Sequence, residues 1–443
     1  MPLTLTVSPA DALIDVPRQI RVAGVPPGTL VTLDSRTLRA DGVAWSSQAT
    51  FFATEDGTVD TGRDAPVAGD YAEISAMGLI WSQHPEEPSQ NFMAEDVLQP
   101  LVTEIRAITP ESETATAELA QRFAAPGVTR REVRDAGLTA TLFTPEGAGP
   151  HPLVIVLNGS TGGINEARCA LYASHGYQAL GLGYFKVPGR SPYITNTPLE
   201  YFETALRWSR EHLQPAHGFI ALSGQSRGGE LSLLLASRHP EQVRAVIAYV
   251  PGAMVHGAQG AADPQQGGWS GPAWTENGQP LPHLWQDNRA VHWHPWDGAA
   301  PPHRNHNVFL AGLTDTETAA RARIPVEKIQ APVLLISGRD DRAWPSSLYS
   351  RMVVHTLHRN GHGYPVVHLD YDNAGHSINF PYLPTTQLER RHPVSGVPFT
   401  SGGTPGGNAH ADAGSWHGVL DFLAQVRGPA SRTEASHRKR AAD

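Results

Sequence analysis

One serine in this chain has the sequence context that makes a hydroxyl nucleophilic. Ser226 is the centre of a Gly-x-Ser-x-Gly pattern that runs from Gly224 to Gly228. The apolar stretch 219–222 before it is typical of a buried strand, and the leucine-rich stretch from Leu231 begins a helix. A serine between strand and helix sits on a strained turn, and flanking glycines let other backbone come close without a Cβ clash. We therefore predict a nucleophile elbow at Ser226.

A serine hydroxyl needs a base to take its proton and a carboxylate to orient that base. Where an elbow is present, the acid and the histidine follow the serine in that chain order, each in a loop after a strand. Asp340 and Asp341 follow one predicted strand, and His376 follows the next. We predict a triad of Ser226, His376 and Asp341. Asp340 remains the alternative acid, and either aspartate could instead cap a turn or a helix.

The charge that develops when a carbonyl is attacked needs hydrogen-bond donors close by. One donor is the backbone N–H after the nucleophile, here that of Arg227, and a second comes from a loop after an earlier strand. The Gly-rich stretch 158–163 follows an apolar strand, and Ser160 or Thr161 would supply the second N–H. A phosphate-binding loop is disfavoured because the stretch has neither Gly-Lys-Ser/Thr nor the spacing of a dinucleotide fingerprint.

Strand-like and helix-like segments alternate from about residue 129, as in a mainly parallel sheet with helices on both faces. The elbow follows the fifth of eight predicted strands, which indicates an α/β-hydrolase over residues 126–427. We expect a disordered, solvated tail at 428–443. The predicted strands are 131–133, 139–143, 153–157, 179–182, 219–222, 245–249, 333–337 and 366–369, and the predicted helices include 166–175, 198–212 and 228–238.

Residues 1–125 show a different pattern. Short alternating segments are separated by Pro and Gly turns, and no helical period is sustained, which is typical of a small β-sandwich. We predict an immunoglobulin-like sandwich without reactive residues. The apolar stretch 77–81 needs a partner surface, and the connection 121–131 lacks the Gly/Ser run of a flexible linker, so the sandwich should pack against the hydrolase. Its predicted strands include 3–7, 19–22, 30–33 and 49–53.

An insertion at 251–329 interrupts the alternation and is rich in aromatic and imidazole side chains. The histidine spacings fit no His-x-x-x-His pair with a glutamate, so an aromatic cap over the active site is favoured over a metal site. We expect neither a metal nor a cofactor. The side chains concerned are Trp269, Trp274, Trp285, Trp293 and Trp296 with His283, His292, His294, His303 and His306.

Composition disfavours several classes of protein. A formal net charge of −9 at pH 7 provides no basic field for nucleic acid. Cys169 is the single cysteine, which rules out an internal disulfide and a Cys-rich metal site. No run of eighteen apolar residues predicts a membrane span, and the N-terminal residues do not have the pattern of a signal peptide. The predicted location is the cytoplasm, and the oligomeric state is not predicted.

These motifs together resemble the family of acyl-CoA thioesterases and bile acid-CoA:amino acid N-acyltransferases. The resemblance covers roughly residues 3–425. Segment 76–82 resembles the family's β-sandwich domain. The match is more specific in the hydrolase part, at 199–205, 226–231, 338–341 and 374–376, with Gly402, Gly403, His410 and Trp416 near the C-terminus.

The resemblance implies that Ser226 is the nucleophile, Asp341 the acid and His376 the base. Family members that conjugate amino acids have a cysteine nucleophile, and a serine ester is more readily resolved by water than by an amine. The predicted reaction is therefore hydrolysis of an acyl-CoA thioester, with the sandwich bordering the acyl or CoA entrance. The alternatives are a carboxylesterase, lactonase or peptidase-like serine hydrolase, an acyl-CoA N-acyltransferase, and a binding protein built on the same fold.

Overall fold

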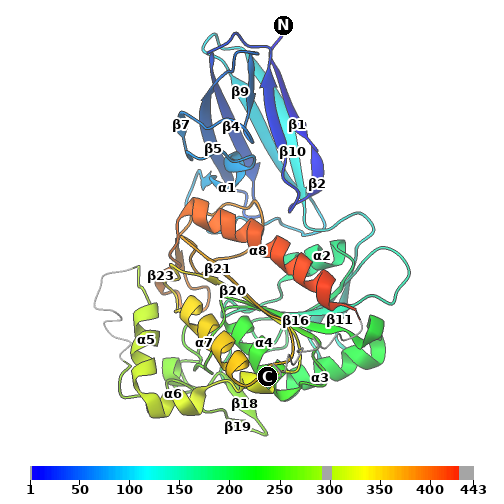
Figure 1. Ribbon diagram of the computed structural model, residues 1–443, viewed down its shortest axis with the longest axis vertical. Coiled ribbons are helices and arrows are strands. Elements are labelled where there is room, and N and C mark those ends of the chain that lie inside the picture. Colours follow the sequence, from blue (N-terminus) through cyan, green and yellow to red (C-terminus); the bar gives the residue numbers. More distant parts are fainter. Residues whose placement is uncertain (1, 292–301, 429–443) are drawn as a thin grey trace, which may run out of the picture.

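The computed structural model describes residues 2–291 and 302–428. A β-rich part stands on a larger α/β part, and the two are stacked along the longest axis (Figure 1). All but the first residue of the tail predicted at 428–443 lies outside the described residues. So do four residues of the insertion: His292, Trp293, His294 and Trp296.

The β-rich part consists of two sheets that share one apolar core. One sheet has the strand order β1-β3-β6, and the other has β2-β10-β9-β4-β5-β7 with β8 paired to β5. Buried and exposed residues alternate along β9, as expected where one face of a sheet is packed and the other is solvated. The predicted β-sandwich is confirmed, and its immunoglobulin-like character stays a prediction. Its elements are β1 (Thr4–Ser8), β2 (Asp11–Leu13), β3 (Gln19–Ala23), β4 (Leu30–Leu38), β5 (Ala44–Phe52), β6 (Thr58–Asp60), β7 (Ala68–Gly69), α1 (Gly78–Trp81), β8 (His84–Pro85), β9 (Leu101–Ile108) and β10 (Thr114–Arg122).

The α/β part is built on an eight-stranded sheet with the order β11-β12-β14-β13-β16-β17-β20-β21. The β11–β12 and β12–β14 pairs are antiparallel, and every later pair is parallel. The predicted α/β-hydrolase fold is confirmed, and each of the eight predicted strands lies in this sheet. The strands are β11 (Thr129–Val133), β12 (Ala140–Thr144), β13 (Leu153–Leu157), β14 (Gln178–Leu182), β16 (Ile220–Gln225), β17 (Ala245–Tyr249), β20 (Val333–Gly338) and β21 (Val366–Tyr371).

Helices cover both faces of this sheet, so its central strands are buried throughout. The core under one face contains residues of α2 (Glu166–Ser174) and α8 (Pro405–Val426). The core under the other contains residues of α3 (Glu200–Trp208), α4 (Arg227–Arg238) and α7 (Ser346–Arg359).

The remaining elements lie around the carboxyl ends of the strands and in the insertion. A small sheet joins β15, β18 and β19, and β22 pairs with β23. The insertion also contains two helices, α5 and α6, which its sequence did not indicate to us. The bounds are β15 (Thr197–Pro198), β18 (Trp274–Glu276), β19 (Gln279–Pro280), α5 (His306–Thr314), α6 (Thr316–Ala322), β22 (Glu389–Arg391) and β23 (Pro398–Thr400).

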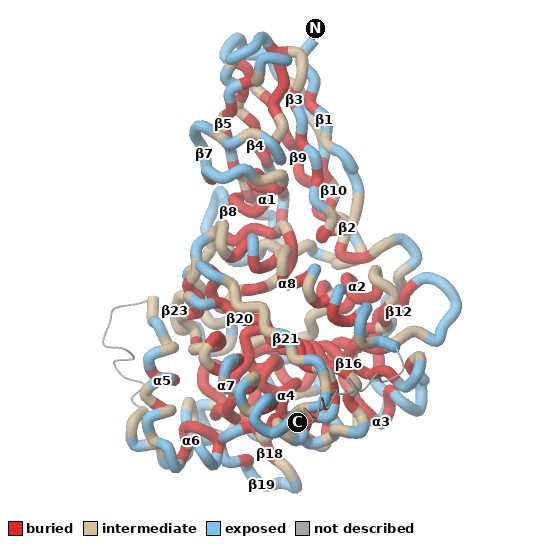
Figure 2. The backbone as a smooth tube through the Cα atoms, viewed as in Figure 1, coloured by how far each residue is buried: buried red, intermediate tan, exposed pale blue. Residues whose placement is uncertain are grey.

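The sandwich packs directly on α8 and on the loop before it, and buried segments lie on both sides of this junction (Figure 2). Phe123, in the connection between the two parts, is fully buried in the hydrolase core. The Trp81 carbonyl accepts a hydrogen bond from the backbone N–H of Thr385 at 2.9 Å. The predicted packing of the sandwich against the hydrolase is therefore seen in the structure.

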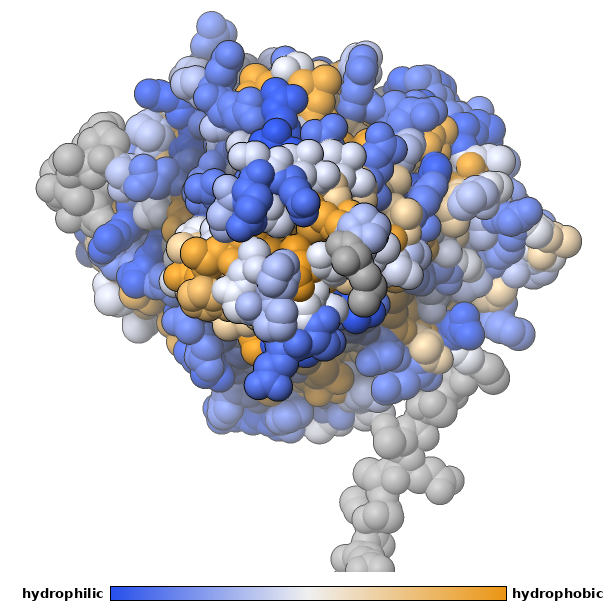
Figure 3. Space-filling view, turned by 90° about the horizontal axis from the view of Figure 1, so that it is seen from above, coloured by the Kyte–Doolittle hydropathy of each residue, from blue (hydrophilic) through white to orange (hydrophobic). Residues whose placement is uncertain are grey.

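The outer surface of the sandwich shows mostly polar side chains, with apolar ones between them (Figure 3). Leu30 and Phe52 are both exposed and face each other across β4 and β5. Single exposed apolar residues are normal on protein surfaces, so they indicate no partner by themselves.

The helices within residues 2–291 and 302–428 include none with the length and apolar character that a membrane span needs.

One buried carboxylate joins the two parts. Asp15 of the sandwich accepts a hydrogen bond from the Trp416 indole N–H at 2.8 Å, and its Oδ2 lies 2.7 Å from Nε2 of His175. Burial alone would raise the pKa of Asp15, but the His175 and Trp416 contacts outweigh it and lower the pKa below its ordinary value of 3.8. Because the folded protein holds this carboxylate ionised, ionisation stabilises the junction.

We predict that Asp15→Ala lowers the free energy of unfolding by about 3 kcal/mol at pH 7, because the buried Trp416 indole and the partly buried His175 imidazole lose a charged acceptor. A group whose pKa is lowered by folding stabilises above its unfolded pKa and loses that contribution as pH falls through the folded value. The difference from wild type should therefore shrink below pH ~4. Urea unfolding across this pH range measures it. Asp11→Asn, at an exposed ion pair with Arg122, is the control with little effect. An equal loss at Asp11 would contradict the assignment.

Candidate active site

Ser226 lies between β16 and α4 in a backbone conformation that most residues avoid. Its φ of 57° and ψ of −118° are strained for a residue with a Cβ. Two backbone hydrogen bonds hold it: its N–H donates to the Tyr249 carbonyl at 2.8 Å, and its carbonyl accepts from the N–H of Glu230 at 3.0 Å. The turn therefore projects the serine side chain away from the end of the sheet.

Glycine is required on both sides of this turn. A Cβ on Gly224 would overlap the carbonyl of Gly228, and a Cβ on Gly228 would overlap the carbonyl of Leu157 at the end of β13. On the facing loop, a Cβ on Gly159 would lie 3.4 Å from that of Ser226. The elbow and the loop after β13 are thus in van der Waals contact, which only small residues permit.

Three side chains from three different loops form a continuous hydrogen-bonded chain. The Oγ of Ser226 is 2.8 Å from Nε2 of His376, and Nδ1 of His376 is 2.8 Å from Oδ2 of Asp341. A carboxylate can only accept, so the His376 proton lies on Nδ1 and leaves the Nε2 lone pair for the Ser226 hydroxyl. The structure brings together the three residues that the sequence predicted as a triad.

The surroundings of the two neighbouring aspartates distinguish them. Asp341 has a side chain only 1% exposed, and it accepts hydrogen bonds from the Ser346 hydroxyl at 2.6 Å and the backbone N–H of Ala343 at 2.9 Å. These donors fix the orientation of the carboxylate. Asp340 instead accepts from the N–H of Gly403 at 3.0 Å and pairs with Arg342. Asp341 is therefore the carboxylate that contacts His376.

The predicted donors of the oxyanion hole are backbone N–H groups of Arg227 and of Ser160 or Thr161. Arg227 is the first residue of α4, where a backbone N–H has no acceptor within the helix. Ser160 lines both cavities that contain Ser226, whereas Thr161 is exposed and lines only the wider one. This position favours Ser160 over Thr161 as the source of the second donor.

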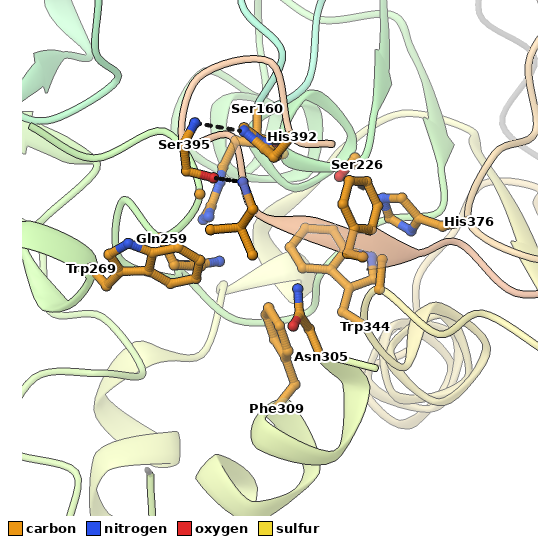
Figure 4. A pocket seen from close by; sticks show the side chains of 15 residues that line it. Ser160, Ser226, Gln259, Trp269, Asn305, Phe309, Trp344, His376, His392 and Ser395 are labelled. Atoms are coloured by element: carbon orange, nitrogen blue, oxygen red, sulfur yellow. Dashed lines mark hydrogen bonds between the residues drawn. The ribbon is translucent and has the colours of Figure 1, made fainter. Parts of the chain in front are cut away.

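Two cavities meet at Ser226. The inner one has a volume of about 90 Å³ and a largely aromatic wall that includes Trp269, Phe309 and Trp344 (Figure 4). The wider one has a volume of about 730 Å³, and Arg390 and Arg391 are in its wall. Segment 90–94 and Val97, from the sandwich side, also line the wider cavity. Ser226 and His376 line both cavities, so they stand where the small apolar space meets the larger one, whose wall mixes apolar and polar side chains.

Residues of the insertion line the inner cavity, and the role of the insertion as a cap stays a prediction. Trp269 lines it together with Asn305 and Phe309 from the region of α5. Trp274 and Trp285 are buried beneath, in the hydrolase core. Within residues 2–291 and 302–428, no group of three or more His, Cys, Asp and Glu side chains could hold a metal ion.

A buried ionic cluster of Glu230, Arg227 and His256 lies under the elbow, and it was not predicted from the sequence. Glu230 is fully buried. Its carboxylate lies 2.7 Å from Nδ1 of His256 and 3.3 Å from the Arg227 guanidinium. The same carboxylate accepts a hydrogen bond from the Trp274 indole N–H. Burial would raise the pKa of Glu230, yet Arg227 and His256 lower it overall. The ionised Glu230 thus anchors the side chain of Arg227, whose backbone N–H faces the nucleophile's turn. Glu230 stood in the motif at 226–231, but nothing local pointed to His256.

Comparison with known proteins shows the family of this chain. Residues 15–135 match the model of the acyl-CoA thioester hydrolase/BAAT N-terminal region, and residues 197–429 match that of the BAAT/acyl-CoA thioester hydrolase C-terminal part. The chain belongs to this family. It is an enzyme of the serine hydrolase type, as the sequence indicated.

Three relatives are similar over nearly their whole length. Acyl-coenzyme A thioesterase 6 of Mus musculus is 30% identical, with 96% of each chain covered. Acyl-coenzyme A thioesterase 2, mitochondrial, of Rattus norvegicus is 29% identical over 95% of this chain and 88% of its own. Acyl-coenzyme A amino acid N-acyltransferase 2 of Mus musculus is 29% identical over 96% of this chain and 97% of its own. Since one relative is named as mitochondrial, the cytoplasmic location stays a prediction.

We predict that Asp341→Asn lowers kcat by about 10⁴-fold, because the amide no longer holds the required tautomer of His376. Asp340→Asn is the matched control one residue away, and it should lose far less because its carboxylate pairs with Gly403 and Arg342 and makes no hydrogen bond to His376 within the described residues. Steady-state kinetics of both folded variants measure the difference. Comparable losses in the two would contradict the assignment of Asp341.

Proposed function

We propose that this enzyme hydrolyses acyl-CoA thioesters to a free acid and CoA through a Ser226 acyl-enzyme. The observation that carries the proposal is the hydrogen-bonded chain of Ser226, His376 and Asp341 at the junction of two cavities. The membership of a family of acyl-CoA thioester hydrolases and acyltransferases supports the substrate class.

The reaction follows from the tautomer of His376. Its Nε2 takes the proton of Ser226 as Oγ attacks the thioester carbonyl, and the buried carboxylate of Asp341 stabilises the resulting imidazolium. The C–S bond then breaks, and the thiol leaves with the proton from His376. A water molecule, deprotonated by His376, attacks the ester carbon and releases the acid from Ser226. Backbone N–H groups of Arg227 and Ser160 would hold the oxyanion in both steps.

The two cavities suit the two halves of the substrate. Arg390 and Arg391 line the wider one, and arginine side chains suit the phosphates of CoA. The inner one is lined mainly by apolar groups and suits an acyl chain. Because segment 90–94 lines the wider cavity, we expect the predicted sandwich domain, 1–125, to border the CoA side of the predicted hydrolase domain, 126–427. The insertion 251–329 would cap the acyl side.

Hydrolysis is favoured over transfer to an amine by the identity of the nucleophile. A serine ester is an ordinary oxygen ester, whereas a thioester on cysteine reacts readily with amines. One relative is named as an amino acid N-acyltransferase, so transfer is the second candidate function. A carboxylesterase, lactonase or peptidase with the same triad is the third.

We predict that Ser226→Ala lowers turnover by at least ~10³-fold, the scale of losing a triad member. The measurement is CoA release from acyl-CoA, run beside p-nitrophenyl esters and small peptides. Glycine and taurine added to the thioester assay test transfer. Efficient ester cleavage with no CoA release would favour the third candidate, and amide formation would favour the second. Unchanged turnover in folded Ser226→Ala would refute the triad altogether.

We also predict a preference for short acyl chains. An engineered cavity of about 150 Å³ holds one benzene molecule, so the 90 Å³ inner cavity should take roughly six carbons or fewer. Each methylene beyond that limit should lower kcat/KM by about tenfold or more. A series from acetyl-CoA to palmitoyl-CoA measures the profile. Trp269→Ala should extend it to longer chains, while Gln265→Ala, at an exposed site in the same insertion, should not. A maximum at long chains in the wild type would contradict the assignment of the inner cavity.

A further inference from the structure

A second imidazole stands beside Ser226 without belonging to the triad. His392 directly follows β22 and lines both cavities. Its Nε2 is 2.9 Å from the hydroxyl oxygen of Ser160, on the loop that faces the nucleophile. Figure 4 shows Ser160 and His392 together in the wall of the inner cavity, beside Ser226.

The protonation state of His392 follows from the groups around it. Its Nδ1 lies 3.2 Å from the backbone nitrogen of Val394 and 3.4 Å from that of Ser395, and both of these groups can only donate. Nδ1 therefore accepts, and the proton lies on Nε2. Burial, with the nearby charges of Lys186 and Arg227, lowers the pKa of His392 to about 4. The imidazole is thus neutral near pH 7, with its N–H directed at Ser160.

This tautomer excludes a second serine–histidine nucleophile. In the triad, Nδ1 of His376 faces a carboxylate, so Nε2 is free to take a proton. In His392, Nδ1 faces donors, so Nε2 already carries a proton and cannot accept one from Ser160. The two pairs contain the same residue types with opposite hydrogen-bond directions. Ser160 receives a hydrogen bond where Ser226 gives one.

The consequence concerns the proton of the Ser160 hydroxyl. Because its oxygen accepts from His392, its own O–H points elsewhere, and no acceptor for it is found within the part of the chain that the structure describes. Ser160 follows Gly159, whose position would put a Cβ 3.4 Å from that of Ser226. Ser160 and Ser226 line the same two cavities, so the free donor faces the space in which the carbon attacked by Ser226 would lie.

We propose that the Ser160 hydroxyl donates a hydrogen bond to the oxyanion, beside the two backbone N–H groups, and that His392 is the residue that positions it. This inference rests on the proposed nucleophile. As the bond from Ser226 Oγ to the acyl carbon forms, the carbonyl electron pair moves to oxygen, and that oxygen accepts from Ser160. No proton leaves Ser160, and the interaction weakens again when the C–S bond breaks.

The first test removes the donor itself. Ser160→Ala should lower kcat for butyryl-CoA and p-nitrophenyl butyrate by roughly 10²-fold with little change in KM, because the oxyanion exists only after attack begins. Ser160→Thr, which keeps a hydroxyl, should recover most of the rate. A kcat for Ser160→Ala within twofold of wild type, or a loss confined to KM, would overturn the proposal.

The second test separates positioning from a structural role. His392→Gln keeps an N–H donor and should retain more activity than His392→Leu, which has none. Affinity for butylboronic acid, which forms a tetrahedral anion on Ser226, should fall in parallel with kcat across the variants. Affinity for a non-hydrolysable butyryl-CoA thioether should stay unchanged. Equal rates for the glutamine and leucine variants, or boronate affinities that do not follow kcat, would overturn the role of His392.

The control Ser226→Ala keeps this inference distinct from the proposed function. If Ser226→Ala is inactive while Ser160→Ala matches wild type, only the assignment of Ser160 fails. If Ser226→Ala is fully active, the nucleophile itself is wrong, and the inference fails with it. Because the ester substrate does not contain CoA, the outcome does not depend on whether the natural substrate is a thioester.

Discussion

The contact between the backbone of the elbow and the end of β13 is the constraint on which the site depends. Gly228 meets the Leu157 carbonyl without a Cβ, so the start of α4 lies directly against the neighbouring strand. That contact holds Ser226 in its strained conformation and brings the loop after β13 beside it. β16 pairs with β13 on one side and β17 on the other, so the nucleophile sits between loops that supply donors on one side and charge partners on the other. A side chain at Gly228 would separate all of these groups at once.

Fixed hydrogen-bond directions then give each polar group one role. The carboxylate of Asp341 makes His376 an acceptor toward Ser226, and the backbone donors at Val394 and Ser395 make His392 a donor toward Ser160. Both settings are imposed from the far side of the ring, where water cannot easily compete. Such preorganisation matters because donors that are already oriented need not reorganise when charge develops.

The sequence predicted the sheet because buried parallel strands are nearly continuous apolar runs, and it predicted the triad because chain order fixes which loops follow which strands. It favoured Asp341 but left Asp340 as an alternative, because the directions of two adjacent loop side chains depend on partners elsewhere in the chain, such as Gly403 for Asp340. His392, Asp15 and His256 were not found either. Each acts through contacts with residues far away in the chain, and a lone histidine or aspartate has no local signal. The helices of the insertion were missed because its tryptophans suggested only aromatic loops.

The choice between hydrolysis and transfer is decided by chemistry more than by space. On the proposed assignment of the wider cavity to CoA, departure of CoA would leave this cavity open to the second nucleophile that attacks the Ser226 ester. Water and a small amine both fit in about 730 Å³, so volume does not select between them. His376 can deprotonate either one. The remaining difference is the bond to be broken: an oxygen ester on Ser226 is less reactive toward amines than the thioester a cysteine would form, and water is present at far higher concentration. A single atom of the nucleophile, within an otherwise shared scaffold, therefore favours release of the free acid.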